Sequence, residues 1–505
     1  MGENKVIVRY APSPTGPQHI GGIRTALYNY LFAKKHRGTF ILRIEDTDQT
    51  RFVPKSESYI MEALAWLGIT PDQGVIQGGP CGPYRQSERK SIYKSYAEEL
   101  IQKGKAYYAF DTTEALDTMR SRLKAAKVAA PKYNAITRAA MQNSLTLPAE
   151  EVTRRLEAAE PYVIRLLVDP KATVKVYDQV RGWVKVQGAS LDDKVLLKED
   201  GMPTYHLANI VDDHLMGITH VIRGEEWLPS APIHALLYEA FGWEPPLFVH
   251  LPLILRNQGE GKLSKRVAQE SDTPIFPLTW DDPTSGITFQ GFRERGYLPE
   301  ALLNFLALLG WHPSGDQEIF THDELIEAFS LKGINKSGAR FDVEKAQWIN
   351  QQHLKKMNDG YLATTYLLPS LKAKGLDVSL DKAIEVCHVV KERICFPKDL
   401  PEESIYFFQP PPAYPHAVTQ PQKAFINACI TQFASVHPWN SETIKASSQA
   451  CTQAAELKSR HTMPLLRKIL TGREKGVKLP LMMAVLGQEE VINRLKTSQK
   501  SLVTS

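Results

Sequence analysis

The chain has 505 residues, of which 43% are hydrophobic and 23% are charged, so its composition is that of a globular protein with material for several cores. Its net charge of +5 is too small to indicate a partner by itself. The sequence predicts no secretory leader, and its longest nearly apolar stretch, 301–311, is too short to cross a bilayer. Five cysteines without a CxxC pair argue against a disulfide framework and a structural zinc site. We therefore expect a cytoplasmic protein that does not enter a membrane.

Strand and helix patterns alternate over the first 70 residues. Runs rich in β-branched residues at 5–10 and 39–44 predict two strands, and apolar residues at helical spacing predict helices after about residue 20 and over 53–67. The loop after the first strand is rich in Pro and Gly, which neither a helix nor a central strand tolerates. This alternation predicts a parallel sheet with helical crossovers.

The pattern changes after about residue 108. Between Thr118 and Ala149 there are six basic residues and no acidic one. The alternation of strand and helix returns at Thr219–Arg223, with a helix predicted over about 230–241. We interpret residues 106–205 as an insertion that splits a nucleotide-binding sheet.

The chain is almost wholly helical in pattern from about residue 298 onward. Residues 456–505 contain ten Lys or Arg and four Asp or Glu. This second basic region is a candidate contact for the phosphates of a nucleic acid, and a solvated helix face is the alternative.

Residues 9–22, RYAPSPTGPQHIGG, join the end of a predicted strand to the start of a predicted helix, where ligands bind in open α/β sheets. Gly21 and Gly22 lack a Cβ, so a nucleotide can lie close to the backbone. The helix N-terminus offers N–H groups to phosphate, and His19 can donate a hydrogen bond to a phosphoryl oxygen. The alternative is a Pro-rich connector with a structural histidine.

Four further segments carry polar side chains at predicted strand ends or loops. Residues 261–266, GKLSKR, place three cations and a hydroxyl where they suit a triphosphate, and a basic surface loop is the alternative. Residues 43–48, RIEDTD, also suit a helix cap, and the acids of 220–227, HVIRGEEW, also suit a structural ion pair. In the fourth segment, 201–214, His206 and His214 do not match a common metal-ligand spacing.

Together, and in their order along the chain, these segments resemble the class I aminoacyl-tRNA synthetases. Most of the chain resembles the bacterial glutamyl-tRNA synthetases. Residues 17–22 are similar to the family's HIGH element, and residues 262–266 are similar to its KMSKS element. The resemblance implies an α/β fold, in which a Rossmann-type parallel sheet is split by an α+β acceptor-binding insertion and followed by all-α anticodon-binding domains. It implies these boundaries: a catalytic domain in 1–105 and 206–256, the insertion in 106–205, a stem-contact region with the Lys-Leu-Ser-Lys-Arg loop in 257–340, and a helical anticodon-binding region in 341–505.

The resemblance also implies ATP-dependent ligation of L-glutamate to the 3′ end of tRNA(Glu) through a glutamyl-adenylate, with release of AMP and diphosphate. His19 and Lys265 are then the expected catalytic residues. The ATP site would contain His19, Gly21, Gly22, Glu226, Trp227, Lys262, Ser264, Lys265 and Arg266. The glutamate site would contain Arg9, Ser13, Glu45, Tyr205, Asn209 and Arg223. In it, Arg9 would meet the γ-carboxylate, with Tyr205 and Asn209 beside it. Arg223 would meet the α-carboxylate and Glu45 the ammonium group, and the opposite assignment of the two arginines stays open.

The chain departs from the family in two places. Many members begin a zinc site with two cysteines after a Tyr-Tyr pair, whereas here Tyr107-Tyr108 is followed by Ala109, Phe110 and Asp111. We therefore expect Mg²⁺ with ATP and no zinc. Residues 267–292 are longer than the usual link, and we assign them no function. The resemblance implies ATP, L-glutamate and tRNA(Glu) as partners, and a monomer.

Other functions stay open from the sequence. A glutaminyl-tRNA synthetase would have a β-barrel anticodon domain where this chain is helical in pattern. A glutamyl enzyme that also charges tRNA(Gln) would differ at one or two unplaced residues. A small-molecule nucleotidylyltransferase would be far shorter, and a non-catalytic RNA-binding relative would lack His19 or Lys265.

Overall fold

The structure is a computed structural model that describes residues 5–257, 261–263, 273–413, 417–501 and 503–504. It divides into two compact units, one made of Met1–Arg295 and Leu302–Val343 and the other of Gly296–Ala301 and Glu344–Ser505. Helix α9 (Pro299–Leu308) contributes residues to both units.

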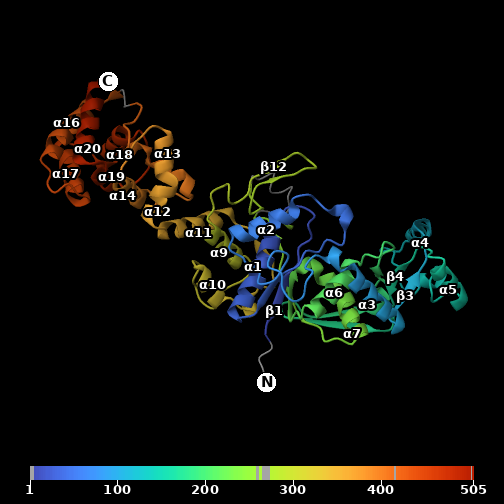
Figure 1. Cartoon of the computed structure of the whole chain (residues 1–505). Coiled ribbons are helices and arrows are strands. Elements are labelled where there is room, and N and C mark those ends of the chain that lie inside the picture. The colour runs from blue at the N-terminus through green and yellow to red at the C-terminus, as the bar shows by residue number, and fades with distance from the viewer. Residues whose placement is uncertain (1–4, 258–260, 264–272, 414–416, 502, 505) are drawn as a thin grey trace. The chain divides into compact units, whose positions relative to one another are not determined.

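The larger unit is built on parallel strands (Figure 1). β1 (Ile7–Tyr10) pairs in parallel with β2 (Thr39–Leu42). β8 (His220–Gly224) pairs in parallel with β9 (Leu247–Leu251), which pairs in parallel with the end of β5 (Thr173–Asp178), and β6 (Gly182–Gln187) is antiparallel to β5 at the edge. The backbone N–H of Thr219 donates to the Ile7 carbonyl oxygen at 2.9 Å, which joins the two groups of strands. The strands β1, β2 and β9 are buried at nearly every position, as expected for a sheet covered on both faces.

The helices that follow these strands cover the sheet. They are α1 (Ile20–Lys35), α2 (Ser56–Trp66), α3 (Lys90–Gln102), α6 (Tyr205–Leu215) and α7 (Ala231–Phe241). α1 is buried along most of its length, and Lys34 and Lys35 in its last turn oppose the negative end of the helix dipole. A core that includes Tyr93, Leu207 and Phe248 packs α3, α6 and α7 against the strands, and this packing fixes the strand ends that form the site.

The stretch predicted as an insertion contains two kinds of structure. β3 (Ala106–Ala109), β4 (Val163–Leu166) and β7 (Val195–Leu197) form an antiparallel sheet, and α4 (Thr113–Ala125) and α5 (Ala149–Glu157) lie near it in Figure 1. β5 and β6 fall in the same stretch of sequence, but β5 pairs with β9 of the parallel sheet. The chain therefore enters the parallel sheet again before residue 205, which is the predicted end of the insertion. The boundaries 106 and 205 stay a prediction.

The rest of the larger unit consists of short elements. These are β10 (Ile254–Leu255) paired with β13 (Ala339–Arg340), β11 (Trp280–Asp281) paired with β12 (Thr288–Phe289), and helix α10 (His322–Ala328). The hairpin of β11 and β12 lies in the described part of the long stretch 267–292.

The smaller unit is helical. Its helices are α11 (Val343–Lys356), α12 (Asp359–Leu362), α13 (Leu368–Ala373), α14 (Leu380–Val390), α15 (Leu400–Ser404), α16 (Gln420–Ala434), α17 (Ser441–Ala454), α18 (Ser459–Thr471), α19 (Leu479–Leu486) and α20 (Gln488–Ser501). It also contains a parallel pair of two-residue strands, β14 (Ala417–Val418) and β15 (Val503–Thr504). The predicted α/β sheet followed by a helical C-terminal region is confirmed. Among the described residues, no helix has both the length and the apolarity to span a membrane.

Candidate active site

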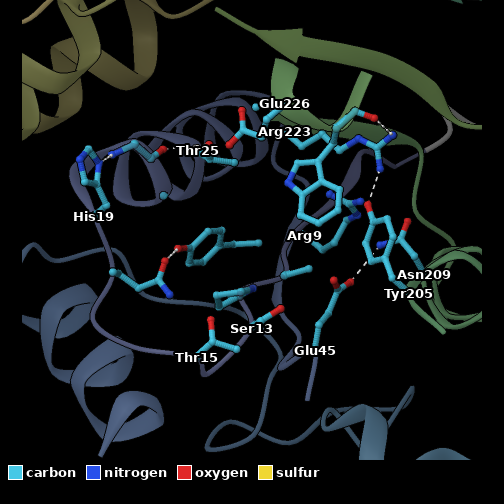
Figure 2. Close-up of a pocket in the computed structure, with 18 of the residues that line it drawn as sticks. Arg9, Ser13, Thr15, His19, Thr25, Glu45, Tyr205, Asn209, Arg223 and Glu226 are labelled. Carbon is cyan, nitrogen blue, oxygen red and sulfur yellow. Dashed lines mark hydrogen bonds between the residues drawn. The ribbon is translucent and has the colours of Figure 1, made fainter. Parts of the chain in front are cut away.

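A cavity of about 400 Å³ opens at the ends of β1 and β8. Its walls come from the loop after β1, the first turns of α1, the residue Glu45 after β2, the helix α6 and the residues after β8. In Figure 2, Arg9, Arg223, Glu45, Tyr205 and Asn209 gather toward one end of this cavity, and His19 lies toward the other. The cavity thus has an end rich in fixed charge and an end formed by a helix N-terminus.

Arg9, on β1, is held by a buried carboxylate. Its Nε and Nη2 donate to the two oxygens of Asp213 at 3.0 and 3.3 Å, and Nη1 of Arg43 donates to the same Asp213 at 2.8 Å. All three side chains are almost fully buried. Burial would raise the pKa of the Asp213 carboxyl, but the guanidinium groups of Arg9 and Arg43 outweigh it and hold that pKa below its usual value. One carboxylate therefore serves two arginines, and it fixes the guanidinium plane of Arg9 at the cavity wall.

Glu45 provides a carboxylate at the same end of the cavity. Its Oε1 accepts hydrogen bonds from Asn209 Nδ2 at 2.9 Å and from Arg43 Nη2 at 3.1 Å. Burial raises the pKa of the Glu45 carboxyl, and the guanidinium groups of Arg43 and Arg9 oppose that rise. Asn209 donates through its amide, and its buried Oδ1 has no hydrogen-bond partner among the described residues. Glu45 and the Asn209 oxygen together suit a cationic group with several N–H donors.

Arg223, on β8, is the second arginine of the cavity. Its Nη1 donates to the Tyr205 hydroxyl at 2.7 Å, and its Nε donates to His250 Nε2 at 3.0 Å. The rings of Tyr205 and Trp227 lie 4.4 Å apart between centroids, so the Tyr205 side chain is also fixed by packing. Burial, more than the nearby charges, raises the pKa of Tyr205 to about 12, which keeps the hydroxyl neutral and able to donate to a ligand.

His19 is the N-cap residue of α1. Its Nδ1 accepts a hydrogen bond from the Gly21 backbone N–H at 3.0 Å. Because Nδ1 accepts, a neutral imidazole carries its proton on Nε2, which is then the donor. A Cβ on Gly22 would lie 2.6 Å from Oε1 of Gln18 and 2.8 Å from the hydroxyl of Tyr10, so a larger residue would displace the hydrogen bond that joins these two side chains.

Glu226 and Trp227 follow β8 in a short 3₁₀ helix, Glu225–Ser230. Oε1 of Glu226 lies 3.8 Å from Nζ of Lys262, and both side chains are about half exposed. This ion pair brings the start of the Lys-Leu-Ser-Lys-Arg segment to the edge of the cavity. The predicted site residues Ser264, Lys265 and Arg266 lie outside the described residues.

The structure brings most of the predicted site residues to this one cavity. The predicted residues that line it are Arg9, Ser13, His19, Gly21, Gly22, Glu45, Tyr205, Asn209, Arg223, Glu226 and Trp227. Tyr205 and Asn209 were expected beside Arg9. In the structure Tyr205 is bonded to Arg223 and Asn209 is bonded to Glu45.

Several residues of the site were not among the predicted set. Thr15, Gln18, Thr25 and Arg51 also line the cavity, and Asp213 and His250 hold its two arginines. A signal for His250 was present in the sequence, because it is the one polar residue of the apolar run Leu247–Leu251. Asp213 had no such signal, because the polar residues Asp212 and His214 flank it in α6.

The stretch predicted as the insertion holds a polar network at the place where the sequence departs from the family's cysteine pattern. The Tyr133 hydroxyl donates to Oδ2 of Asp111 at 2.7 Å, and the Gln142 backbone N–H donates to Oδ1 of Asp111 at 2.8 Å. Asp111 therefore ties two later segments of the insertion together by hydrogen bonds. Across the part of the chain that is described, no three His, Cys, Asp or Glu side chains are grouped so that they could hold a metal ion.

Comparison with known proteins gives consistent matches over the whole chain. The family described as tRNA synthetases class I (E and Q), catalytic domain, matches residues 5–348, and an anticodon binding domain matches residues 346–498. The glutamate–tRNA ligase of Amoebophilus asiaticus is 55% identical over 99% of both chains, and that of Cytophaga hutchinsonii is 53% identical over 97% of this chain and 96% of the other. The crystal structure of a glutamate tRNA ligase from Elizabethkingia meningosepticum, in complex with its amino acid, superimposes with a TM-score of 0.91, with 46% identity over 99% of this chain and all of the other.

Proposed function

We propose, for a chain that belongs to the bacterial glutamate–tRNA ligase family of class I tRNA synthetases, that it joins L-glutamate to the 3′ end of tRNA(Glu) at the expense of ATP. The observation that carries this proposal is the cavity itself. Two buried arginines and a buried carboxylate lie toward one end, and a helix N-terminus with His19 lies toward the other. The first end suits an amino acid with two carboxylates, and the second suits the phosphates of ATP.

In the first step, an oxygen of the glutamate α-carboxylate attacks the α-phosphorus of ATP. The bond from that phosphorus to the oxygen bridging the α- and β-phosphates breaks, and diphosphate leaves with the electron pair. No protein nucleophile takes part, so catalysis depends on positioning and on stabilising the charge of the phosphoryl group. We assign the Nε2 proton of His19 to a phosphoryl oxygen of the transition state, and Lys262 and Lys265 to the leaving diphosphate.

In the second step, a ribose hydroxyl at the end of the tRNA attacks the carbonyl carbon of the glutamyl-adenylate. The mixed-anhydride bond breaks, AMP leaves, and the hydroxyl proton passes to the released phosphate or to water. We assign residues 106–205 to binding of the acceptor end and residues 341–505 to binding of the anticodon, as predicted from the resemblance. We place the protein in the cytoplasm as a monomer.

The choice of glutamate over glutamine follows from the arginines. Glutamine has nearly the size of glutamate, so the volume of the cavity does not separate the two. The neutral side-chain amide of glutamine would leave a buried guanidinium with one hydrogen-bond acceptor too few. An unsatisfied buried donor of this kind would weaken the free energy of binding by about 1–3 kcal/mol or more. We assign Arg9 to the γ-carboxylate, Arg223 to the α-carboxylate and Glu45 to the ammonium group. Tyr205, Asn209 and Ser13 complete the glutamate site.

Magnesium enters this proposal with ATP. The carboxylates of the cavity fit such an ion only in part, because Glu45 is already bonded to Arg43 and Asn209. We therefore propose that phosphates and water hold most of the Mg²⁺ coordination sphere, and that the ion neutralises the leaving diphosphate. Chelation with EDTA should stop glutamate charging, and Mg²⁺ but not Zn²⁺ should restore it.

A charging assay with two tRNAs and two amino acids tests the proposed function. The protein should charge tRNA(Glu) with glutamate, and Arg9→Gln should raise KM for glutamate by about 10- to 100-fold. Arg293→Gln, which removes an arginine paired with Glu62 and Glu294 at the surface, is the matched control and should leave KM unchanged. Charging of tRNA(Gln) with glutamine instead would favour the glutaminyl alternative, and charging of both tRNAs with glutamate would identify a non-discriminating enzyme.

A further inference from the structure

Three neighbouring strands each contribute one buried polar side chain to a row that begins at Arg223 and leads away from the cavity. Arg223 on β8 and His250 on β9 are direct partners in the parallel ladder, and Asp178 ends β5, which pairs with β9. Arg223 Nε lies 3.0 Å from His250 Nε2, and His250 Nδ1 lies 2.7 Å from Asp178 Oδ2. Asp178 and His250 are both completely buried, and neither of them lines the cavity.

The hydrogen-bond partners determine the tautomer of His250. Arg223 Nε carries one hydrogen and can only donate, so His250 Nε2 must accept. Nδ1 then carries the imidazole proton and donates it to the Asp178 carboxylate. Burial lowers the pKa of His250 more than its bond to Asp178 raises it, which agrees with a neutral ring that accepts on one side and donates on the other.

Asp178 is surrounded by donors. Its Oδ2 also accepts from the His250 backbone N–H at 3.0 Å, and its Oδ1 accepts from the backbone N–H groups of Val180 at 2.9 Å and Arg181 at 2.7 Å. Within the described part of the chain, the other three hydrogen bonds to Asp178 all come from backbone N–H donors. Both hydrogen bonds of the row therefore run in the same donor-to-acceptor direction: the guanidinium donates to the imidazole, and the imidazole donates to the carboxylate.

We infer that His250 and Asp178 are positioning residues that hold the guanidinium of Arg223 in the orientation that binds a carboxylate of glutamate. With Nε fixed by His250 and Nη1 fixed by the Tyr205 hydroxyl, the guanidinium plane is set from two sides. Without His250, the buried Nε would lose the acceptor that it has at 3.0 Å, and the guanidinium would rotate toward another one. The inference rests on the proposed function, in which Arg223 binds substrate.

Two substitutions separate this role from simple packing. His250→Asn keeps a donor near Nδ1 for Asp178 but removes the acceptor for Arg223, and His250→Gln can place an amide oxygen near the position of Nε2. His250→Asn should raise KM for glutamate by about 10- to 100-fold, since a displacement of about 1 Å in a positioned group has effects of that size. KM for ATP should stay within about twofold, and His250→Gln should recover part of the loss. His214→Asn, at an exposed histidine of the same unit, is the matched control.

Asp178→Asn tests the far end of the row. If the new NH₂ group lies on the His250 side, it opposes the proton on Nδ1, and that proton should move to Nε2 or the ring should turn away. If it lies on the other side, it opposes the backbone N–H groups of Val180 and Arg181 and should displace the side chain that holds the imidazole. This variant should therefore raise KM for glutamate as His250→Asn does. Long-range ¹⁵N–¹H spectra of histidine-labelled wild-type protein at pH 7 provide a measurement that needs no variant. They should show His250 protonated on Nδ1 only, and protonation on Nε2 would overturn the inference.

Arg223→Lys separates failure of the inference from failure of the proposed function. If Arg223→Lys weakens glutamate binding while the His250 and Asp178 variants do not, the positioning role is wrong and the proposed function stands. If wild-type protein charges no tRNA with glutamate, the proposed function is wrong. As a further check, an analogue whose α-carboxylate is reduced to an alcohol should bind His250→Asn within about twofold of wild type, because it lacks the group that Arg223 holds.

Discussion

Replacing His19 can separate its role as a helix cap from the role toward ATP that we propose for it. Its Nδ1 accepts the Gly21 N–H at 3.0 Å and caps α1, and its Nε2 is the donor that we assign to ATP. Loss of the cap should cost about 0.5–2 kcal/mol of stability. Loss of the donor should cost about 100- to 1000-fold in kcat, which corresponds to about 2.7–4 kcal/mol of transition-state stabilisation.

Three variants distribute these losses differently. His19→Ala removes both the cap and the donor. His19→Asn keeps an acceptor near Nδ1 for Gly21, since Asn is also a good N-cap residue, and removes the donor at Nε2. His19→Gln can place an amide N–H near Nε2 and loses the cap. We therefore expect His19→Asn to melt at the temperature of the wild-type protein but to be as slow as His19→Ala.

The measurement is the initial rate of tRNA charging with labelled glutamate at saturating ATP and tRNA, together with a thermal melt of each variant. His19→Ala should also melt lower than His19→Asn. If His19→Asn keeps a rate within about twofold of wild type, His19 acts only as a helix cap and the assigned chemical role is wrong. If KM for ATP rises while kcat is unchanged, His19 binds the ground state and the transition state equally.

Three further predictions concern stability, pH and salt. Asp213→Asn removes the carboxylate shared by Arg9 and Arg43 and should destabilise the larger unit by about 3–5 kcal/mol in denaturant unfolding, whereas Glu62→Gln at an exposed pair should cost less than about 1 kcal/mol. Burial lowers the pKa of His206 to about 4, so its contribution to stability is complete above pH 6.5 and is lost as pH falls toward 4. His206→Gln should therefore reduce the fall in melting temperature over that interval, and an equal fall in the variant would contradict this prediction. Affinity for tRNA should fall at least about tenfold between 50 and 200 mM salt. Lys124→Gln should lower the slope of log K against log salt by about 1, and an unchanged slope would show that the basic segment between Thr118 and Ala149 does not contact RNA.

The order of elements around the cavity could be predicted from local sequence. Proline and glycine in the loop after β1 exclude regular structure there, and the buried runs of β1 and β2 are the continuous apolar strands that a covered parallel sheet requires. His19, Gly21 and Gly22 fall where such a sheet binds phosphate, because a loop leads from a strand end into a helix N-terminus. The loop, the two strands and the start of the helix each depend on residues that are close together in the chain, so they can be predicted from a single sequence.

The partners of the charged groups depend on the tertiary structure. Arg9 and Asp213 are 204 residues apart in the chain, and the sequence does not show that Asp213 also serves Arg43. The same holds for Asp178, which lies in the stretch predicted as the insertion, yet reaches His250 because β5 pairs with β9. Strand pairing across the insertion cannot be inferred from local periodicity, since periodicity gives the faces of a strand and not its neighbours. Local sequence therefore predicts most of the polar residues that line the cavity, whereas the packing of distant strands and helices decides which residues hold them in place.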